Sequence, residues 1–121
     1  MSTTHEEQLR LWAKGLYPLE AGTELLIRGF GGRFASPGMS WIKEFDDESG
    51  YWIDFEEIEP TSGMLSGGER RFLLLAASIA EGVEVKVGDV ISGLDVGNVR
   101  LVLAAIAHGA GMKELYPYPP L

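Results

Sequence analysis

Two long apolar segments, at residues 66–80 and 95–108, constrain the fold more than any other feature of this sequence. The second segment carries apolar residues around nearly its whole circumference, and Arg100 is the only charge after the capping residue Asp95. A helix that is apolar on all sides is usually buried. We therefore expect 95–108 to be the core helix, packed against 66–80, with Leu103 lining the core so that its truncation opens a cavity. In so small a domain, part of the apolar surface of this helix could stay uncovered, and that face would form a homodimer or partner interface.

Capping signals predict where the helices begin. Thr3 or Thr4 can cap a first helix, and Pro18 suits the first turn of a second. Ser66 and Glu69 have the S-x-x-E spacing of a capping box, in which each side chain bonds a backbone N–H of the other residue. The expected helices span about 4–15, 18–30, 66–80 and 95–108.

A β-hairpin is predicted between the second and third helices. Residues 41–45 and 51–55 are rich in aromatic residues and are separated by the turn-forming run 46–50. Residues 83–87 alternate between Val and charged residues, which is compatible with a short strand or with an extended linker. The sequence thus predicts a single α+β domain over 1–121: about four helices packed against a small antiparallel β-hairpin, with a Pro-rich, extended tail at 116–121.

The net charge of -8 comes from one segment of the chain. Of the 18 acidic residues, eight lie within 44–59, which has no Lys or Arg, and the ten that remain balance the 10 bases. Direct binding of nucleic acid is not expected, because it needs a basic surface. We expect these like charges to face solvent and to complement a basic partner, unless Arg28, Arg33, Arg70 or Arg71 neutralise them. The candidate partner-binding residues are Glu44, Asp46, Asp47, Glu48, Asp54, Glu56, Glu57 and Glu59.

Two short motifs begin at Leu65 and Ser92, 27 residues apart. Residues 65–69 read LSGGE, and 92–95 read SGLD. Together they resemble the signature motif and D-loop of ABC-type ATPases, including the SMC-like branch, and the resemblance extends over 65–107. The LWA and GFGGRF runs at 11–13 and 29–34 also resemble segments of small actinobacterial proteins, a likeness that implies no function.

The chain departs from the ATPase pattern at the groups that handle phosphate and metal. It has no G-x-x-x-x-G-K-[ST] loop, and it contains no Gly-Lys dipeptide. Gly88 stands where the resemblance would place the Mg²⁺-binding Asp. Without these groups the γ-phosphate cannot be positioned or its charge neutralised, so we expect no ATP hydrolysis.

The start of the third helix supports two interpretations. Ser66, Gly67 and Gly68 could be a structural helix cap, or their free N–H groups could bind a small anion or a nucleotide. The histidines, His5 and His108, lie in a first and a last helical turn and are too few for a metal site. We therefore predict no catalytic residues, no metal and no cofactor.

These observations favour a non-enzymatic binding or regulatory protein that acts through a protein–protein interface. The absence of cysteine excludes disulfides and thiolate–metal sites, and no apolar run is long enough for a membrane span. A cytoplasmic location without membrane contact is expected, and a homodimer is possible. One alternative is an acidic, DNA-mimicking inhibitor of a nucleic-acid-binding protein. Another is a small anion- or nucleotide-binding module.

Overall fold

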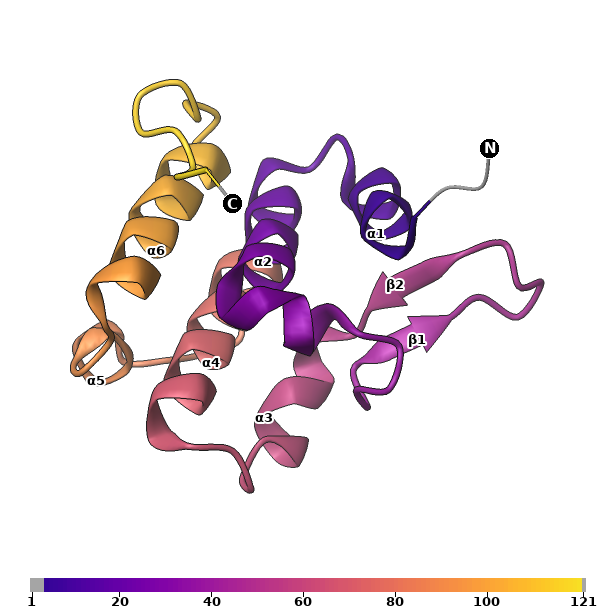
Figure 1. Ribbon diagram of the computed structural model, residues 1–121, viewed down its shortest axis with the longest axis horizontal. Helices are drawn as coiled ribbons and strands as arrows, with labels where there is room; N and C mark the ends of the chain where they lie inside the picture. The colour runs from indigo at the N-terminus through magenta and orange to yellow at the C-terminus, as the bar shows by residue number, and fades with distance from the viewer. Residues whose placement is uncertain (1–3, 121) are drawn as a thin grey trace.

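The computed structural model describes residues 4–120 and has an α+β fold made mostly of helices (Figure 1). Two of its six α-helices are short segments of four and five residues, too short for a helical period to be visible in the sequence, so the expectation of about four helices is slightly off. In chain order the elements are α1 (His5–Ala13), α2 (Tyr17–Arg28), the 3₁₀ helix η1 (Gly29–Ala35), β1 (Ile42–Glu44), β2 (Tyr51–Ile53), the 3₁₀ helix η2 (Phe55–Glu57), α3 (Ile58–Thr61), α4 (Gly67–Glu81), α5 (Val87–Ile91) and α6 (Val96–Gly109).

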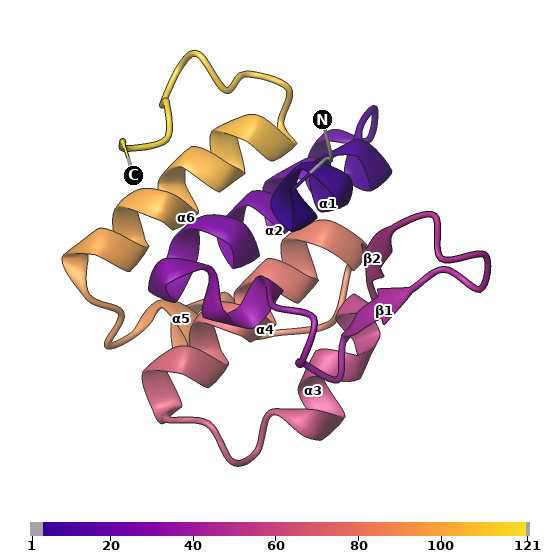
Figure 2. The same cartoon turned by 45° about the vertical axis from the view of Figure 1, so that its right-hand side comes forward.

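The central helix is α2, which lies between α4 and α6 (Figures 1 and 2). Every residue from Ala21 to Ile27 is buried. At Gly22, α2 approaches α4 so closely that a Cβ atom there would lie 2.5 Å from the Cβ of Ala80 and 2.8 Å from the carbonyl oxygen of Ala76. The absence of a side chain at this position therefore permits the α2–α4 crossing.

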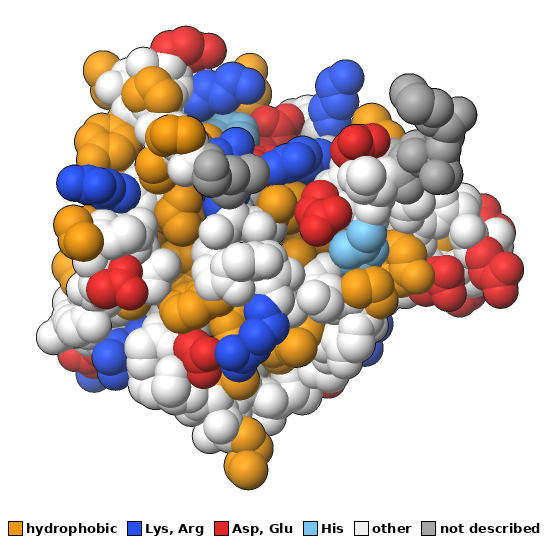
Figure 3. Space-filling model, viewed as in Figure 1, with side chains coloured by type: hydrophobic (Ala, Val, Ile, Leu, Met, Phe, Trp, Pro, Cys, Tyr) orange, Lys and Arg blue, Asp and Glu red, His pale blue; other side chains and the backbone are white. Residues whose placement is uncertain are grey.

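The prediction that α6 is the core helix, packed on α4, is wrong. One side of α6, including Leu101 and Val102, is buried against α2, and α6 makes few contacts with α4 because α2 lies between them. The other side faces solvent, where Leu103 is 43% and Ile106 is 55% exposed. Truncation of Leu103 therefore opens no core cavity. Figure 3 shows hydrophobic side chains gathered over this helix, on the left of the view.

The predicted antiparallel hairpin is confirmed. Ile42 pairs with Ile53, and the Phe45 N–H donates to the carbonyl of Gly50 to close the loop. Ile53 is buried, and Trp52 lies against Trp12 of α1 with ring centroids 6.4 Å apart. The second strand of the hairpin therefore packs against α1, while the hairpin loop projects from the body of the protein (Figure 1).

The predicted helix starts are confirmed where the structure describes them. Thr4 caps α1, and Asp95 caps α6 through its bond from the N–H of Asn98. Thr3 lies outside the described residues. The second helix ends earlier than expected, at Arg28, because the backbone is extended at Gly29 and has positive φ angles at residues 30–32. Residues 83–86 form an extended linker rather than a strand.

No helix within residues 4–120 has the length and apolar character to cross a lipid bilayer.

Candidate functional site

The acidic segment 44–59 is an ordered, solvent-facing surface. Its side chains lie on the hairpin, its loop and the following short helices, and Figure 3 shows acidic groups at the right-hand edge, over the hairpin loop. Six of the eight acids are exposed and two, Asp54 and Glu57, are half-buried. The expected exposure is therefore confirmed for most of the segment, whereas the partner-binding role of these residues remains a prediction.

Of the four arginines that could neutralise this segment, two pair with acids outside it and only one pairs with an acid inside it. Arg28 bonds Glu24, and Arg33 lies 3.1 Å from Glu69, whereas Arg70 reaches Glu59 at 3.5 Å. Within residues 4–120, Glu59 is the only one of the eight acids in an ion pair. The segment therefore keeps nearly all of its negative charge.

Ser66 begins α4 with the predicted capping box. The Ser66 N–H donates to Glu69 Oε1 at 3.1 Å, and the Glu69 N–H donates to Ser66 Oγ at 3.2 Å. The hydrogen bond from the Ser66 backbone and the charge of Arg33 lower the pKa of Glu69. A carboxylate of the chain itself therefore already lies at this helix start, beside Gly67 and Gly68, and anion binding there remains a prediction.

The fold brings the two ATPase-like motifs together, which their spacing alone did not predict. The guanidinium of Arg71 lies between them: Nη1 is 2.9 Å from the Cβ position of Gly67, and Nη2 is 3.0 Å from that of Gly93. A Cβ atom at either position would crowd the guanidinium, although the end of this flexible side chain can move aside. At Gly93 the positive φ of 81° independently favours glycine, a structural reason that does not require ATP.

Glu24 forms a buried ion-pair network that no pattern in the sequence predicted. It is 8% exposed, and its carboxylate accepts from Arg10 Nε and from Arg28 Nε, each at 2.7 Å. Burial acts to raise the pKa of Glu24, but the bonds from the two guanidinium groups lower it below its ordinary value. The i,i+4 spacing of Glu24 and Arg28 was the available signal, although such pairs are common on exposed helix faces.

His108 links α6 to α2 and to the C-terminal tail. Its Nε2 lies 2.8 Å from Glu20 Oε1, and its Nδ1 lies 2.9 Å from the hydroxyl of Tyr118. Because a carboxylate only accepts, Nε2 donates, and in a neutral imidazole Nδ1 then accepts from Tyr118. Burial raises the pKa of Tyr118, whose ring lies under the guanidinium of Arg28 at 4.3 Å. His108 lies in the last turn of α6, as predicted, but it is a buried connector.

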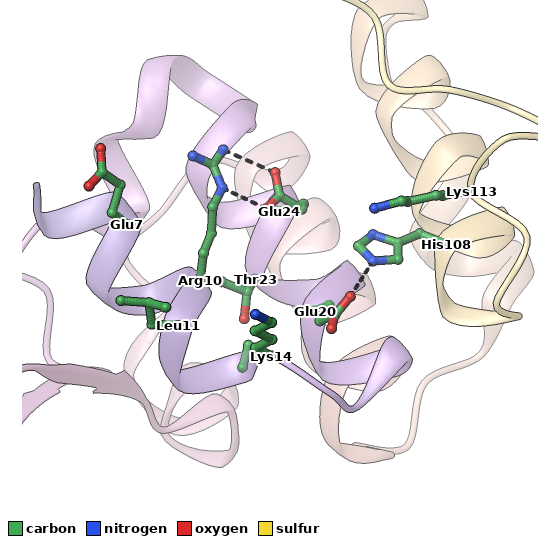
Figure 4. Close-up of a pocket in the computed structure, with 10 residues that line it drawn as sticks. Glu7, Arg10, Leu11, Lys14, Glu20, Thr23, Glu24, His108 and Lys113 are labelled. Carbon is green, nitrogen blue, oxygen red and sulfur yellow. Dashed lines mark hydrogen bonds and ion pairs between the residues drawn. The ribbon is translucent and has the colours of Figure 1, made fainter. Parts of the chain in front are cut away.

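A cavity of about 480 Å³ opens between α1, α2 and the end of α6 (Figure 4). The Glu24 network and the Glu20–His108 pair form part of its wall. Six of the ten residues that line the cavity are Lys, Arg or Glu, and apolar atoms supply most of its exposed surface. His5, by contrast, bonds the carbonyl of Ala35, and no group of three or more potential metal ligands gathers within residues 4–120. The cavity is lined by Glu7, Arg10, Leu11, Ala13, Lys14, Glu20, Thr23, Glu24, His108 and Lys113.

Comparisons of the chain with protein-family models, curated proteins and solved structures found no match. The surfaces available are the acidic segment 44–59, the exposed side of α6 and the charged cavity.

Proposed function

We propose that this chain is a non-enzymatic binding or regulatory module, and that the acidic segment 44–59 binds a basic surface of a partner protein. The observation that carries this proposal is the absence of internal neutralisation: among residues 4–120, Glu59 alone of the eight acids has a cationic partner. Charge that is kept exposed and unpaired raises the rate and the specificity of association with an opposite charge. This makes a basic protein the best-matched partner.

The hairpin scaffold supports the proposal because it fixes the positions of the charges. Trp41 and Phe55, which flank the two strands at the base of the hairpin, are almost fully buried. The loop is held by the Phe45–Gly50 bond and by a bond of 3.0 Å from the Ser49 N–H to Asp47 Oδ1. An ordered display of like charges loses less conformational entropy on binding than a flexible acidic tail does.

Affinity capture with the full chain and a matched pair of variants tests the proposal. The test variant replaces Asp46, Asp47 and Glu48 by their amides, and all three residues are exposed. The control neutralises three exposed acids outside the segment: Glu81→Gln, Glu84→Gln and Asp89→Asn. We expect a captured partner to elute at moderate salt, to be lost with the test variant and to be retained by the control. Equal retention by both variants would contradict the proposal.

The DNA-mimic alternative is a narrower form of the same proposal, in which the basic surface normally binds nucleic acid. It predicts that duplex DNA competes with the chain for the captured partner. A partner that binds the chain and duplex DNA at the same time would rule out mimicry and leave the broader proposal intact.

We propose self-association through α6 as a second candidate function. The observation that favours it is the exposed apolar stripe formed by Val96, Val99, Leu103 and Ile106. A stripe of this kind can pair with the same stripe of a second copy around a twofold axis. We expect a concentration-dependent dimer in analytical ultracentrifugation that Leu103→Gln weakens. Met64→Gln is the matched control because Met64 is exposed but lies outside α6. A strict monomer at high concentration would exclude this candidate.

A further inference from the structure

Beyond a role in protein binding, we propose that the cavity between α1, α2 and the end of α6 binds a small oxyanion. The ligand would carry a carboxylate or a phosphate group, held by the ammonium groups of Lys14 and Lys113 and by the hydroxyl of Thr23. All three residues line the cavity (Figure 4).

The acids in the wall of the cavity are already satisfied by the protein. Glu24 is bonded by Arg10 and Arg28. Glu20 accepts from the Gly15 N–H at 2.7 Å through Oε2 and is bonded to His108 through Oε1. Because each of these four carboxylate oxygens has a donor, the wall offers little to a cationic ligand.

Among the polar groups that line the cavity, the hydroxyl of Thr23 is the one that is buried without a hydrogen-bond partner within residues 4–120. Thr23 itself is 0% exposed. A buried hydroxyl without a partner is unfavourable, and such groups are uncommon in native proteins. Glu20 and Glu24 line the cavity on the same face of α2, and their carboxylate oxygens all accept hydrogen bonds from the protein. The hydroxyl of Thr23, which lies between them, is therefore the donor that a ligand can use. A ligand oxygen in the cavity would supply the missing partner.

Lys14 and Lys113 add positive charge from two sides of the cavity. Both are exposed, and neither has an ion pair or side-chain hydrogen bond within residues 4–120. Burial acts to raise the pKa of Glu20, but the bonds from Gly15 and His108 lower it, and the charge of Lys113 adds a smaller lowering effect. Figure 4 shows Lys113 extending toward α2, with Lys14 below Thr23 and the exposed Glu7 on the far side from Lys113. The unpaired donors therefore outnumber the unpaired acceptors, which favours an anion.

The test is an NMR titration of the full chain with three probes at millimolar concentration: succinate, inorganic phosphate and the dication putrescine. We expect succinate, phosphate or both to shift the backbone amide signals around Thr23 and His108. The probe that binds more tightly identifies the source of the oxyanion. The variants Lys14→Gln and Lys113→Gln should each weaken binding severalfold, and the double variant should abolish it. Lys86→Gln, an exposed lysine outside the cavity, is the matched control and should bind as the wild type does.

The substitution Thr23→Val separates a ligand-binding hydroxyl from a structural one. It keeps the shape of the side chain and removes the orphan hydroxyl, so the free protein should be at least as stable as the wild type while anion binding falls severalfold. Several results would overturn the proposal: no binding of either anion, binding of putrescine alone, binding that the lysine variants leave unchanged, or signal shifts confined to Ser66–Gly68. A Thr23→Val variant that binds as well as the wild type would remove Thr23 from the site.

Discussion

The substitution Gly22→Ala tests the close crossing of α2 and α4. Alanine normally stabilises a helix relative to glycine by about 0.5–1 kcal/mol, so the sequence alone would predict a gain. In the structure the new Cβ would lie 2.5 Å from the Cβ of Ala80 and 2.8 Å from the carbonyl oxygen of Ala76. Neither atom belongs to a flexible side-chain end, so relief requires the two helices to move apart.

The expected size of the effect follows from these opposing terms. Overpacking of a well-packed contact costs about 1–3 kcal/mol. After the helix-propensity gain is subtracted, Gly22→Ala should lower the free energy of unfolding by up to about 2.5 kcal/mol. A loss of stability, where helix propensity alone predicts a gain, is the result that distinguishes the two effects.

Gly68→Ala provides the matched control. Gly68 also lies in a helix, but a Cβ atom there meets nothing within 4 Å. This variant should gain about 0.4–1 kcal/mol, because alanine restricts the unfolded chain. Urea denaturation followed by circular dichroism measures both values, provided that the slopes agree. A stabilised Gly22→Ala protein would refute the α2–α4 packing described above.

Four further outcomes are expected. Ser66→Ala should lower the free energy of unfolding by about 1 kcal/mol through loss of the capping box, as urea denaturation will show. Leu25→Ala, which truncates a fully buried side chain of α2, should cost about 2–5 kcal/mol, and Leu103→Ala should cost clearly less because 43% of Leu103 is exposed. Because the pKa of Glu24 is lowered in the folded protein, its carboxylate contributes fully to stability above the ordinary pKa of 4.5. That contribution is lost as the pH falls through the lowered pKa. Glu24→Gln should therefore flatten the acid side of a curve of stability against pH. The purified chain should show no Mg²⁺-dependent ATP turnover in a phosphate-release assay, because it lacks a phosphate-loop lysine.

The sequence by itself determined the local elements of this protein. Ser66 and Glu69 stand at the spacing at which each can bond the backbone of the other, and Gly82 supplies the left-handed residue that ends α4. The hairpin followed from aromatic runs flanking a turn-rich loop, and the exposure of its acids followed from their mutual repulsion. These features depend on residues within a few positions of one another, so the order of residues was sufficient to predict them.

Only the tertiary structure decided which helix is central and which polar groups are buried. By composition α6 is more apolar than α2, yet α2 occupies the middle position, and Leu103 faces solvent while Glu24 is buried. A local pattern records how apolar a helix is, but not how many neighbours cover it. The partners of Glu24, Glu20 and His108 come from α1, α2, α6 and the tail, as far as 88 residues apart in the chain. The cavity at their junction exists only because folding brings those elements together, so no local pattern could have revealed it.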